Sequence, residues 1–368
     1  MELANLLRIL VDEKGSDLFI SVGIQPSLKV NGKIRRLGDQ LLEEDEVLNL
    51  VRQTMTDERF RSYVENREAN FAINCPGLGR FRVSAFWQQD CPGCSIRRIE
   101  TVIPTCDELF LPMSVKELAM AKRGLILFVG ATGAGKSTTQ AAMIGYRNSH
   151  ANDHILTIED PVEFVHKHDR SLITQREVGS DTLSFDEGLK SALRQAPDVI
   201  LIGEIRSEET MEFALSFAET GHLCMATLHA NNANQAIERI LHLVPAEKHR
   251  LLMYDLAFNL KAIVAQQLVP TIDGKSRRAA FEIMLNSPLI SDIMRKGEVH
   301  RLKETMSRSR ELGMSTFDQS LFELYQQGAI GFDEALAFAD SSNEVRVMIK
   351  MAAGGNFDSG MLDNVTVA

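Results

Sequence analysis

The segment 130–137 constrains this chain more than any other part of its sequence, because it reads GATGAGKS. It matches the phosphate-binding loop pattern G-x-x-x-x-G-K-[ST] at every fixed position. Glycines let such a loop fold tightly and turn its N–H groups toward phosphate oxygens, and the lysine adds a positive charge beside the β- and γ-phosphates. The serine hydroxyl is a ligand for Mg²⁺. The alternative is a glycine-rich turn that happens to end in Lys-Ser.

The sequence on either side of the motif favours the phosphate-binding interpretation. Residues 125–129 form a continuous apolar run, which is typical of a buried parallel strand. Residues 138–146 contain no Pro and are predicted to form a helix whose N-terminus faces the phosphates. The predicted contacts to a nucleoside triphosphate are Gly130, Ala131, Thr132, Gly133, Ala134, Gly135, Lys136, Ser137 and Thr138, with Ser137 also a Mg²⁺ ligand.

Length and composition limit the class of protein. A chain of 368 residues favours two domains, because single cores stop growing near roughly 250–300 residues. A net charge of −10 and a single Trp argue against a nucleic-acid motor, which needs cationic surface and stacking platforms. No apolar run reaches the roughly 18 residues of a membrane span, and the start lacks a signal-peptide pattern. We therefore expect neither nucleic-acid binding nor membrane insertion.

The cysteines are few and odd in number, which indicates a reduced, cytosolic protein. Among them, Cys91 and Cys94 form a lone C-x-x-C motif. A tetrahedral zinc site needs four ligands, and the sequence has no second pair. We predict a turn that carries two thiols rather than a metal site. The full set is Cys75, Cys91, Cys94, Cys106 and Cys224.

The first hundred residues read as an α/β domain with antiparallel hairpins. Apolar residues alternate with polar ones on both sides of Asn31-Gly32, a dipeptide typical of tight hairpins. Residues 81, 83 and 85 are apolar and alternate with Arg80 and Arg82, which places both arginines on one strand face. Residues 100–112 contain Pro104 and Pro112 and lose this periodicity. We predict a domain over 1–99 and a linker over 100–112.

From residue 113 the pattern changes to apolar runs that alternate with helical stretches. The runs are 125–129, 155–158, 199–202 and 223–228, and residues 189–196 have the spacing of an amphipathic helix. Alternating strands and helices predict a parallel sheet covered on both faces. After about residue 230 the sequence favours helices. We predict an ATPase domain over 113–352 and a mobile tail over 353–368.

Ligands of open α/β sheets bind outside the carboxyl ends of the strands, so residues that follow the apolar runs are expected to share one site. Glu204 follows one run and is predicted to support Mg²⁺. Glu159 and Glu163 follow another and are candidates to orient or deprotonate the attacking water. His222 and His229 bracket the last run, and His229, at its carboxyl end, is predicted to contact the γ-phosphate. Solvated loop acids and a structural histidine are the alternatives.

Phosphoryl transfer also calls for arginines, which a neighbouring subunit can supply. Arg80 and Arg82 are candidates for this role, and Arg97 and Arg98 form a second candidate pair. The alternative for all of them is a solvated sheet face.

Stretches along nearly the whole chain resemble the secretion ATPases of type IV pili, in the retraction branch, and within it the PilU-like members. They are SDLFISVGIQPSLKVNGKIRRL, GRFRVSAF, GATGAGKS, TIEDPVEF, SALRQAPDVILIGEIR, ETGHLCMATLHA and GMSTFDQSL. The resemblance implies an N-terminal PAS-like domain, a C-terminal RecA-like ATPase domain and assembly into a homohexamer that uses ATP and Mg²⁺. It also implies retraction of type IV pili and twitching motility, as an accessory motor beside a primary retraction ATPase.

The same resemblance implies roles for single residues. Glu163 matches the catalytic glutamate that activates water, Glu204 the Walker B acid that supports Mg²⁺, and His229 the His-box sensor. Arg80, Arg82, Arg97 and Arg98 match arginines of the small domain, some of which act across the subunit interface. The implied location is the cytoplasmic side of the inner membrane at the pilus base, with an inner-membrane platform protein as partner.

The sequence departs from the common retraction pattern in three places. Phe19 stands where the motif usually has His, the His-box segment continues as ANNANQA, and the end after Met351 is acidic and Gly-rich. These differences favour the PilU-like branch. An assembly or type II secretion ATPase usually carries a four-cysteine element, whereas only Cys224 lies beyond residue 106 here. A nucleotide-binding adaptor with little hydrolysis of its own stays open as an alternative.

Overall fold

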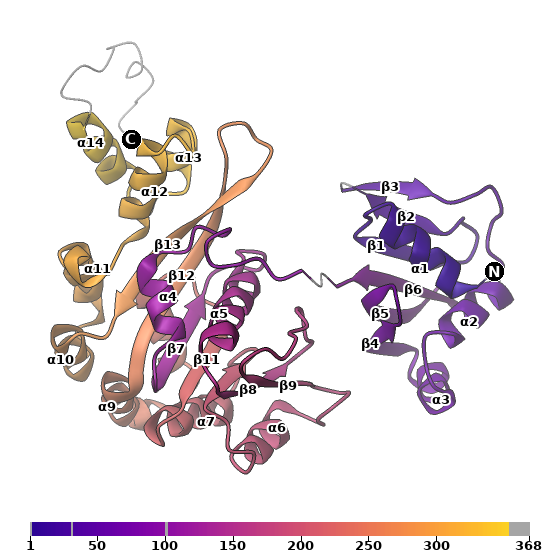
Figure 1. Ribbon diagram of the computed structural model, residues 1–368, viewed down its shortest axis with the longest axis horizontal. Helices are drawn as coiled ribbons and strands as arrows, with labels where there is room; N and C mark the ends of the chain where they lie inside the picture. The colour runs from indigo at the N-terminus through magenta and orange to yellow at the C-terminus, as the bar shows by residue number, and fades with distance from the viewer. Residues whose placement is uncertain (1, 31, 100–101, 353–368) are drawn as a thin grey trace. The chain divides into compact units, whose positions relative to one another are not determined.

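The computed structural model describes residues 2–30, 32–99 and 102–352, and the predicted tail over 353–368 lies outside them (Figure 1). The chain divides into two compact units. The first comprises Met1–Ile103 together with the segments Asp160–Val165 and Glu177–Leu183. The second comprises Pro104–Glu159, His166–Arg176 and Ser184–Ala368.

The first unit is built on a six-stranded antiparallel sheet with the strand order β3-β2-β1-β6-β5-β4. Its elements are α1 (Leu3–Asp12), β1 (Asp17–Ser21), β2 (Ser27–Val30), β3 (Lys33–Arg36), α2 (Glu44–Arg52), α3 (Asp57–Asn66), β4 (Glu68–Cys75), β5 (Gly79–Gln88) and β6 (Cys91–Arg98). Helix α1 buries Leu3, Leu6, Leu7 and Leu10, a helical repeat that packs on Leu18 and other strand residues.

Two turn predictions in this unit have different outcomes. The hairpin prediction is confirmed, since Val30 pairs with Lys33 across a two-residue loop. The prediction of a turn at Cys91–Cys94 is wrong, because these residues lie on β6. The turn comes just before them, at Gln89 and Asp90, which both have positive φ. Cys94 faces the core, and burial raises the pKa of its thiol to about 12.

The second unit is built on a seven-stranded sheet with the order β13-β12-β7-β11-β10-β8-β9 (Figure 1). Its strands are β7 (Gly124–Val129), β8 (His154–Glu159), β9 (Leu172–Glu177), β10 (Val199–Ile202), β11 (Leu223–Leu228), β12 (Leu260–Pro270) and β13 (Arg277–Leu285). The pairs β12–β7, β7–β11, β11–β10 and β10–β8 are parallel, and β12–β13 is antiparallel. Every residue of β7, β10 and β11 is buried, so both faces of the central sheet are covered.

The helices of this unit are α4 (Met113–Ala119), α5 (Lys136–His150), α6 (Phe185–Ala192), α7 (Glu208–Glu219), α8 (Ala233–Leu241), α9 (His249–Asn259), α10 (Pro288–Lys296), α11 (Leu302–Ser307), α12 (Phe317–Gln326), α13 (Phe332–Ala337) and α14 (Ser342–Ala352). Short 3₁₀ turns lie at Ala246–Lys248, Val299–Arg301 and Arg310–Leu312. None of the helices in the described ranges combines the length and apolar composition of a membrane span.

The predicted apolar runs are confirmed as β7, β8, β10 and β11, which lie side by side in the order β7-β11-β10-β8. The expectation that the chain is mostly helical beyond residue 230 is confirmed, but β12 and β13 also lie there and add two strands beside β7. Their pairing is set by distant contacts with β7 rather than by local pattern. The predicted amphipathic helix is shorter than its apolar spacing suggested: it ends at Ala192, Leu193 is exposed, and Ala196 has a non-helical φ of +48°.

Candidate functional site

The phosphate-binding loop connects β7 to α5, as its flanks predict. Gly130, Gly133 and Gly135 have φ of +146°, +79° and +90°, a backbone range that other residues rarely adopt. A Cβ on Gly130 would lie 2.4 Å from the carbonyl oxygen of Gln266 on β12. Gly130 is therefore required both by its backbone conformation and by the close approach of the neighbouring strand.

Lys136 is the first residue of α5, and its ammonium group lies over the loop. Its Nζ donates hydrogen bonds to the carbonyl oxygens of Gly130 at 2.7 Å and Ala131 at 3.0 Å. Ser137 and Thr138 follow in the first turn of the helix and are half-buried. The positive charge, the helix N-terminus and a hydroxyl are thus brought to one place, which is the combination that phosphate and Mg²⁺ require.

Gln266 supports the loop from the adjacent strand, and sequence reasoning missed it. Its Oε1 accepts a hydrogen bond of 2.8 Å from the Thr139 hydroxyl, and both side chains are buried. A Cβ on Gly135 would lie only 2.7 Å from the Nε2 atom of Gln266. The only sequence signal was an amide side chain in the apolar run of β12, so Gln266 is a structural partner of the loop that pattern alone does not reveal.

A cavity of about 1030 Å³ opens beside the loop, between α5 and the β12–β13 hairpin. Gly135, Thr138 and Thr139 line it on the loop side, and Phe110 and Arg278 line it elsewhere. The guanidinium carbon of Arg278 lies 3.4 Å from the centre of the Phe110 ring, in a cation–π contact. The cavity has room for a nucleoside next to the phosphate loop. Phe110 lies within the predicted linker, where no site residue was expected.

Glu204 and His229, predicted to share one site, are in contact. Glu204 follows β10 and His229 follows β11, the neighbouring parallel strand. Glu204 Oε1 lies 3.1 Å from His229 Nε2, and Glu204 Oε2 accepts from Arg206 Nε at 2.7 Å. The Glu204 side chain is 17% exposed and the His229 side chain 51%. The loop after β10 is itself held to β11, because the Ile205 N–H donates to the Thr227 carbonyl oxygen.

The strand register brings this pair to the same sheet edge as the phosphate loop. Leu228, the residue before His229, pairs with Val129, the residue before Gly130. Strand β11 therefore ends level with β7 and beside it. The loop, Glu204 and His229 therefore follow three neighbouring strands at one edge of the sheet, and their shared role in a site stays a prediction.

The other strand-end candidates have different surroundings. Glu159 Oε1 accepts hydrogen bonds from the Thr157 hydroxyl at 2.6 Å and from Gln175 Nε2 at 3.3 Å. Glu163 is exposed and lies in Asp160–Val165, which groups with the first unit, so its role stays a prediction. His222 lies at the opposite end of β11 from His229, with its Nδ1 near the Phe217 carbonyl oxygen.

The candidate arginines lie on β5 and β6 of the first unit. Arg82 pairs across the strands with Arg97, so these two share one face, whereas Arg98 pairs with the core residue Phe81. Arg97 Nε donates to Asp17 at 2.7 Å. Arg98 donates to the Val11 carbonyl oxygen at 3.5 Å.

Arg80 is held by an acid that the sequence did not suggest. Its guanidinium donates to Glu177 at 2.8 Å, and the Glu177 side chain is 2% exposed. Action of any of these arginines across a subunit boundary stays a prediction.

The described residues hold no group of three or more His, Cys, Asp and Glu side chains arranged for a metal ion. A Mg²⁺ that takes most of its ligands from phosphates and water needs only one or two protein oxygens. The Ser137 hydroxyl and the Glu204 carboxylate are oxygen donors of that hard type. Both groups are therefore suitable ligands for the predicted Mg²⁺.

Comparison with known proteins gives consistent results. The profile of the family described as "Type II/IV secretion system protein" matches residues 107–344. The chain is 57% identical over 366 residues to the protein named Type IV pilus ATPase PilU of Pseudomonas aeruginosa, covering 100% of this chain and 95% of that protein. It is 40% identical over 335 residues to the Type IV pilus retractation ATPase PilT of the same organism, covering 91% and 97%.

A solved structure is similar over almost the same length. The crystal structure of the pilus retraction motor PilT with bound ADP has a TM-score of 0.88 and 36% identity. The match covers 94% of this chain and 99% of that one. The α/β fold with a mostly parallel ATPase sheet is thereby confirmed.

Proposed function

The chain belongs to the family of type II/IV secretion system proteins, and from this premise we propose that it is a hexameric ATPase that powers type IV pilus retraction. Its relatives identify it as a type IV pilus motility ATPase. We further propose that it works as an accessory motor beside a primary retraction ATPase. Its place would be the cytoplasmic face of the inner membrane at the pilus base, against a platform protein.

The observation that carries the enzymatic proposal is the meeting of three strand ends. The phosphate loop follows β7, His229 follows β11 and Glu204 follows β10, and these strands are consecutive in the sheet. The similar PilT motor binds ADP in its crystal structure, and we propose that this chain takes ATP and ADP at its phosphate loop. The nucleoside would occupy the cavity lined by Thr138, Phe110 and Arg278.

In this proposal each residue of the site has a separate role in ATP hydrolysis. Loop N–H groups and Lys136 bind the β- and γ-phosphates, and bound Mg²⁺ would neutralise charge that develops on their oxygens. Ser137 and Glu204 would hold the cation. Glu163 would orient and deprotonate the attacking water, as its match to the family motif suggests.

In this proposal His229 would sense whether the γ-phosphate is present. Its Nε2 contacts Glu204, so a change at the γ-phosphate that alters the ring position also alters the carboxylate. We propose that a neighbouring subunit's site is completed by one or more arginines of the first unit, from the set Arg80, Arg82, Arg97 and Arg98. That arrangement would make turnover depend on assembly.

ATP turnover by the purified protein tests the proposal. The wild-type chain is expected to hydrolyse ATP with Mg²⁺, alone or with the primary motor present, and Lys136→Ala is expected to remove this activity. Wild-type protein that binds ATP but adds no hydrolysis under either condition would instead favour the adaptor function. A Lys136→Ala protein that turns over ATP like the wild type would defeat the site assignment.

A further inference from the structure

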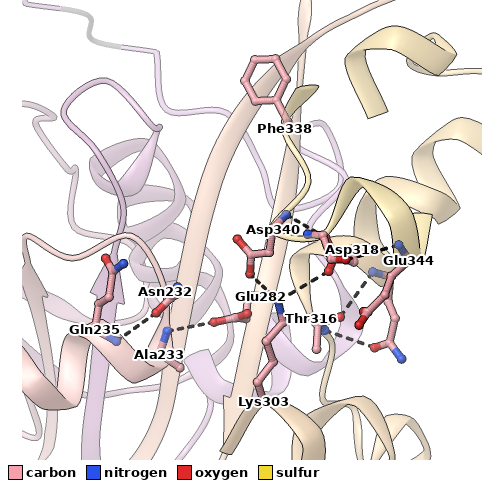
Figure 2. A network of polar contacts seen from close by, with 12 residues as sticks. Asn232, Ala233, Gln235, Glu282, Lys303, Thr316, Asp318, Phe338, Asp340 and Glu344 are labelled. Atoms are coloured by element: carbon pink, nitrogen blue, oxygen red, sulfur yellow. Dashed lines mark hydrogen bonds and ion pairs between the residues drawn. The ribbon is translucent and has the colours of Figure 1, made fainter. Parts of the chain in front are cut away.

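A buried carboxylate outside the nucleotide site connects two parts of the second unit (Figure 2). Glu282 lies on β13 and is 2% exposed. Its Oε1 accepts a hydrogen bond of 2.8 Å from the backbone N–H of Ala233. On its other side are charged residues of the C-terminal helices (Figure 2).

The hydrogen bond to Ala233 fixes the end of the loop that carries His229. Ala233 is the first residue of α8, and only residues 230–232 separate it from His229. Asn232 caps the same helix by accepting from the Gln235 N–H at 2.9 Å. A carboxylate at a helix N-terminus is stabilising, because the first N–H groups have no partner within the helix. Glu282 therefore holds the N-terminus of α8, where the short segment that follows His229 ends.

The C-terminal helices present one base and two acids to Glu282. Lys303 on α11 contacts Asp340, between α13 and α14, at 2.8 Å and Asp318 on α12 at 3.5 Å. Asp318, itself 1% exposed, accepts from the Asp340 N–H at 2.8 Å, just before α14. Any shift of these helices would change the electrostatic potential at Glu282.

The local charges are unequal, since three carboxyl groups of the described residues face a single ammonium group. Burial raises the pKa of Glu282 to about 7, and Asp340 and Asp318 also act to raise this pKa. The Ala233 N–H and Lys303 act in the opposite direction. Glu282 therefore changes charge near neutral pH. Because Asp340, Asp318 and Lys303 all act on its pKa, a shift of any one of them would change that pKa.

We propose that Glu282 is a positioning residue of the nucleotide site, which transmits the state of the C-terminal helices through Ala233 to the loop that holds His229. The inference rests on the proposed ATPase function. An ionised Glu282 forms the stronger, charge-assisted bond to the Ala233 N–H and holds the loop in its working position. A protonated Glu282 holds it less firmly.

The pH profile of ATP turnover separates this role from a structural one. At saturating ATP and Mg²⁺, we expect the wild-type kcat to rise about fivefold between pH 6 and pH 8, as a neutral hydrogen bond becomes charge-assisted. Glu282→Gln is expected to keep the low-pH rate at both values, with KM little changed. Glu238→Gln is the matched control, because it makes the same chemical change at an exposed position of α8 and is expected to keep the wild-type profile.

A second variant tests transmission from the C-terminal helices. Asp340→Asn leaves Glu282 in place but removes an acid that raises its pKa. We expect the midpoint of the pH profile to move to lower pH. Lys303→Gln removes the opposing charge and is expected to move the midpoint to higher pH. A Glu282→Gln protein with the wild-type midpoint, or an Asp340→Asn midpoint that does not move, would overturn the inference.

Hydrogen exchange of the amides in residues 229–236 gives a readout that does not need hydrolysis. Glu282→Gln is expected to speed exchange at Ala233 at pH 8, and Asp340→Asn to slow it near pH 7. If the wild-type protein hydrolyses no ATP, the proposed function fails but these exchange rates still decide the coupling. Unchanged exchange in both variants would contradict it.

Discussion

The Glu204 carboxylate and the His229 ring lie in direct contact, with 3.1 Å between Oε1 and Nε2. The two residues follow adjacent parallel strands, and the strand of His229 lies next to the one that leads into the phosphate loop. This pair links the predicted cation ligand to the predicted phosphate sensor.

Removing the charge of Glu204 is expected to impair hydrolysis more than nucleotide binding. Glu204→Gln keeps the size of the side chain but weakens both the cation site and the contact to His229. The expected loss in kcat is about 10²-fold, the range for removing one preorganised electrostatic group. Steady-state kinetics would measure it, with Glu209→Gln, an exposed acid on α7, as the control. A Glu204→Gln enzyme with the wild-type kcat would contradict the assignment.

Two glycines of the same region are expected to respond oppositely to alanine. Gly130→Ala places a Cβ 2.4 Å from the Gln266 oxygen at a φ of +146°, so we expect lower stability by roughly 1–3 kcal/mol and weaker nucleotide binding. Gly145 lies inside α5, where a new Cβ would meet none of the described residues within 4 Å. Gly145→Ala is expected to gain roughly 0.5–1 kcal/mol. Denaturant unfolding and ADP titration would check both, and equal effects would count against the loop geometry.

Glu282 is expected to make stability fall as pH rises. Its folded pKa of about 7 exceeds the ordinary value of 4.5, so the folded state binds the proton more tightly. The stabilisation from the protonated form is complete below pH 4.5 and is lost as pH rises through about 7. At about 1.4 kcal/mol per pKa unit, the loss is on the order of 3 kcal/mol.

Glu282→Gln is therefore expected to be more stable than wild type at pH 8, by about 1–3 kcal/mol, and close to it at pH 4. Urea unfolding at the two pH values would measure this difference. Together with the lower turnover expected above, the variant would gain stability and lose activity. A buried carboxylate with no role in positioning the site would gain the same stability and keep the wild-type turnover.

Arginine action between subunits is open to a mixing test. Arg82 pairs across the strands with Arg97 on one face of the first unit's sheet, and its Nε has no hydrogen-bond partner among the described residues. If it completes a neighbour's site, Arg82→Ala and Lys136→Ala subunits are both inactive alone but recover part of the activity when mixed. ATPase assays over a series of mixing ratios would show this. A strictly additive response would mean that each site works within one chain.

The sequence could predict a nucleotide site because the parts of that predicted site are local. The phosphate loop is contiguous, and Glu204 and His229 each follow a short apolar run. Parallel pairing then brings the ends of those runs together, which general rules for open sheets anticipate. The contact between Glu204 and His229 needed only the strand order in addition.

Other parts of the site depend on contacts that no local pattern encodes. Gln266 reaches the loop because β12 pairs with β7, although the two strands are far apart in sequence. Phe110 and Arg278 come together from distant parts of the ATPase unit's sequence. Glu282 reads as one polar position in a strand, and only the fold brings Ala233 and Lys303 to it.

Pilus retraction in living cells tests the central claim most directly. Cells that lack this protein would be supplied with the wild-type chain or with Lys136→Ala, each with and without the primary retraction ATPase. With the primary motor present, we predict faster or more forceful retraction with the wild-type chain than with Lys136→Ala. Retraction that is equal with the two chains, at equal protein levels, would contradict ATP turnover at this loop as the source of the motion.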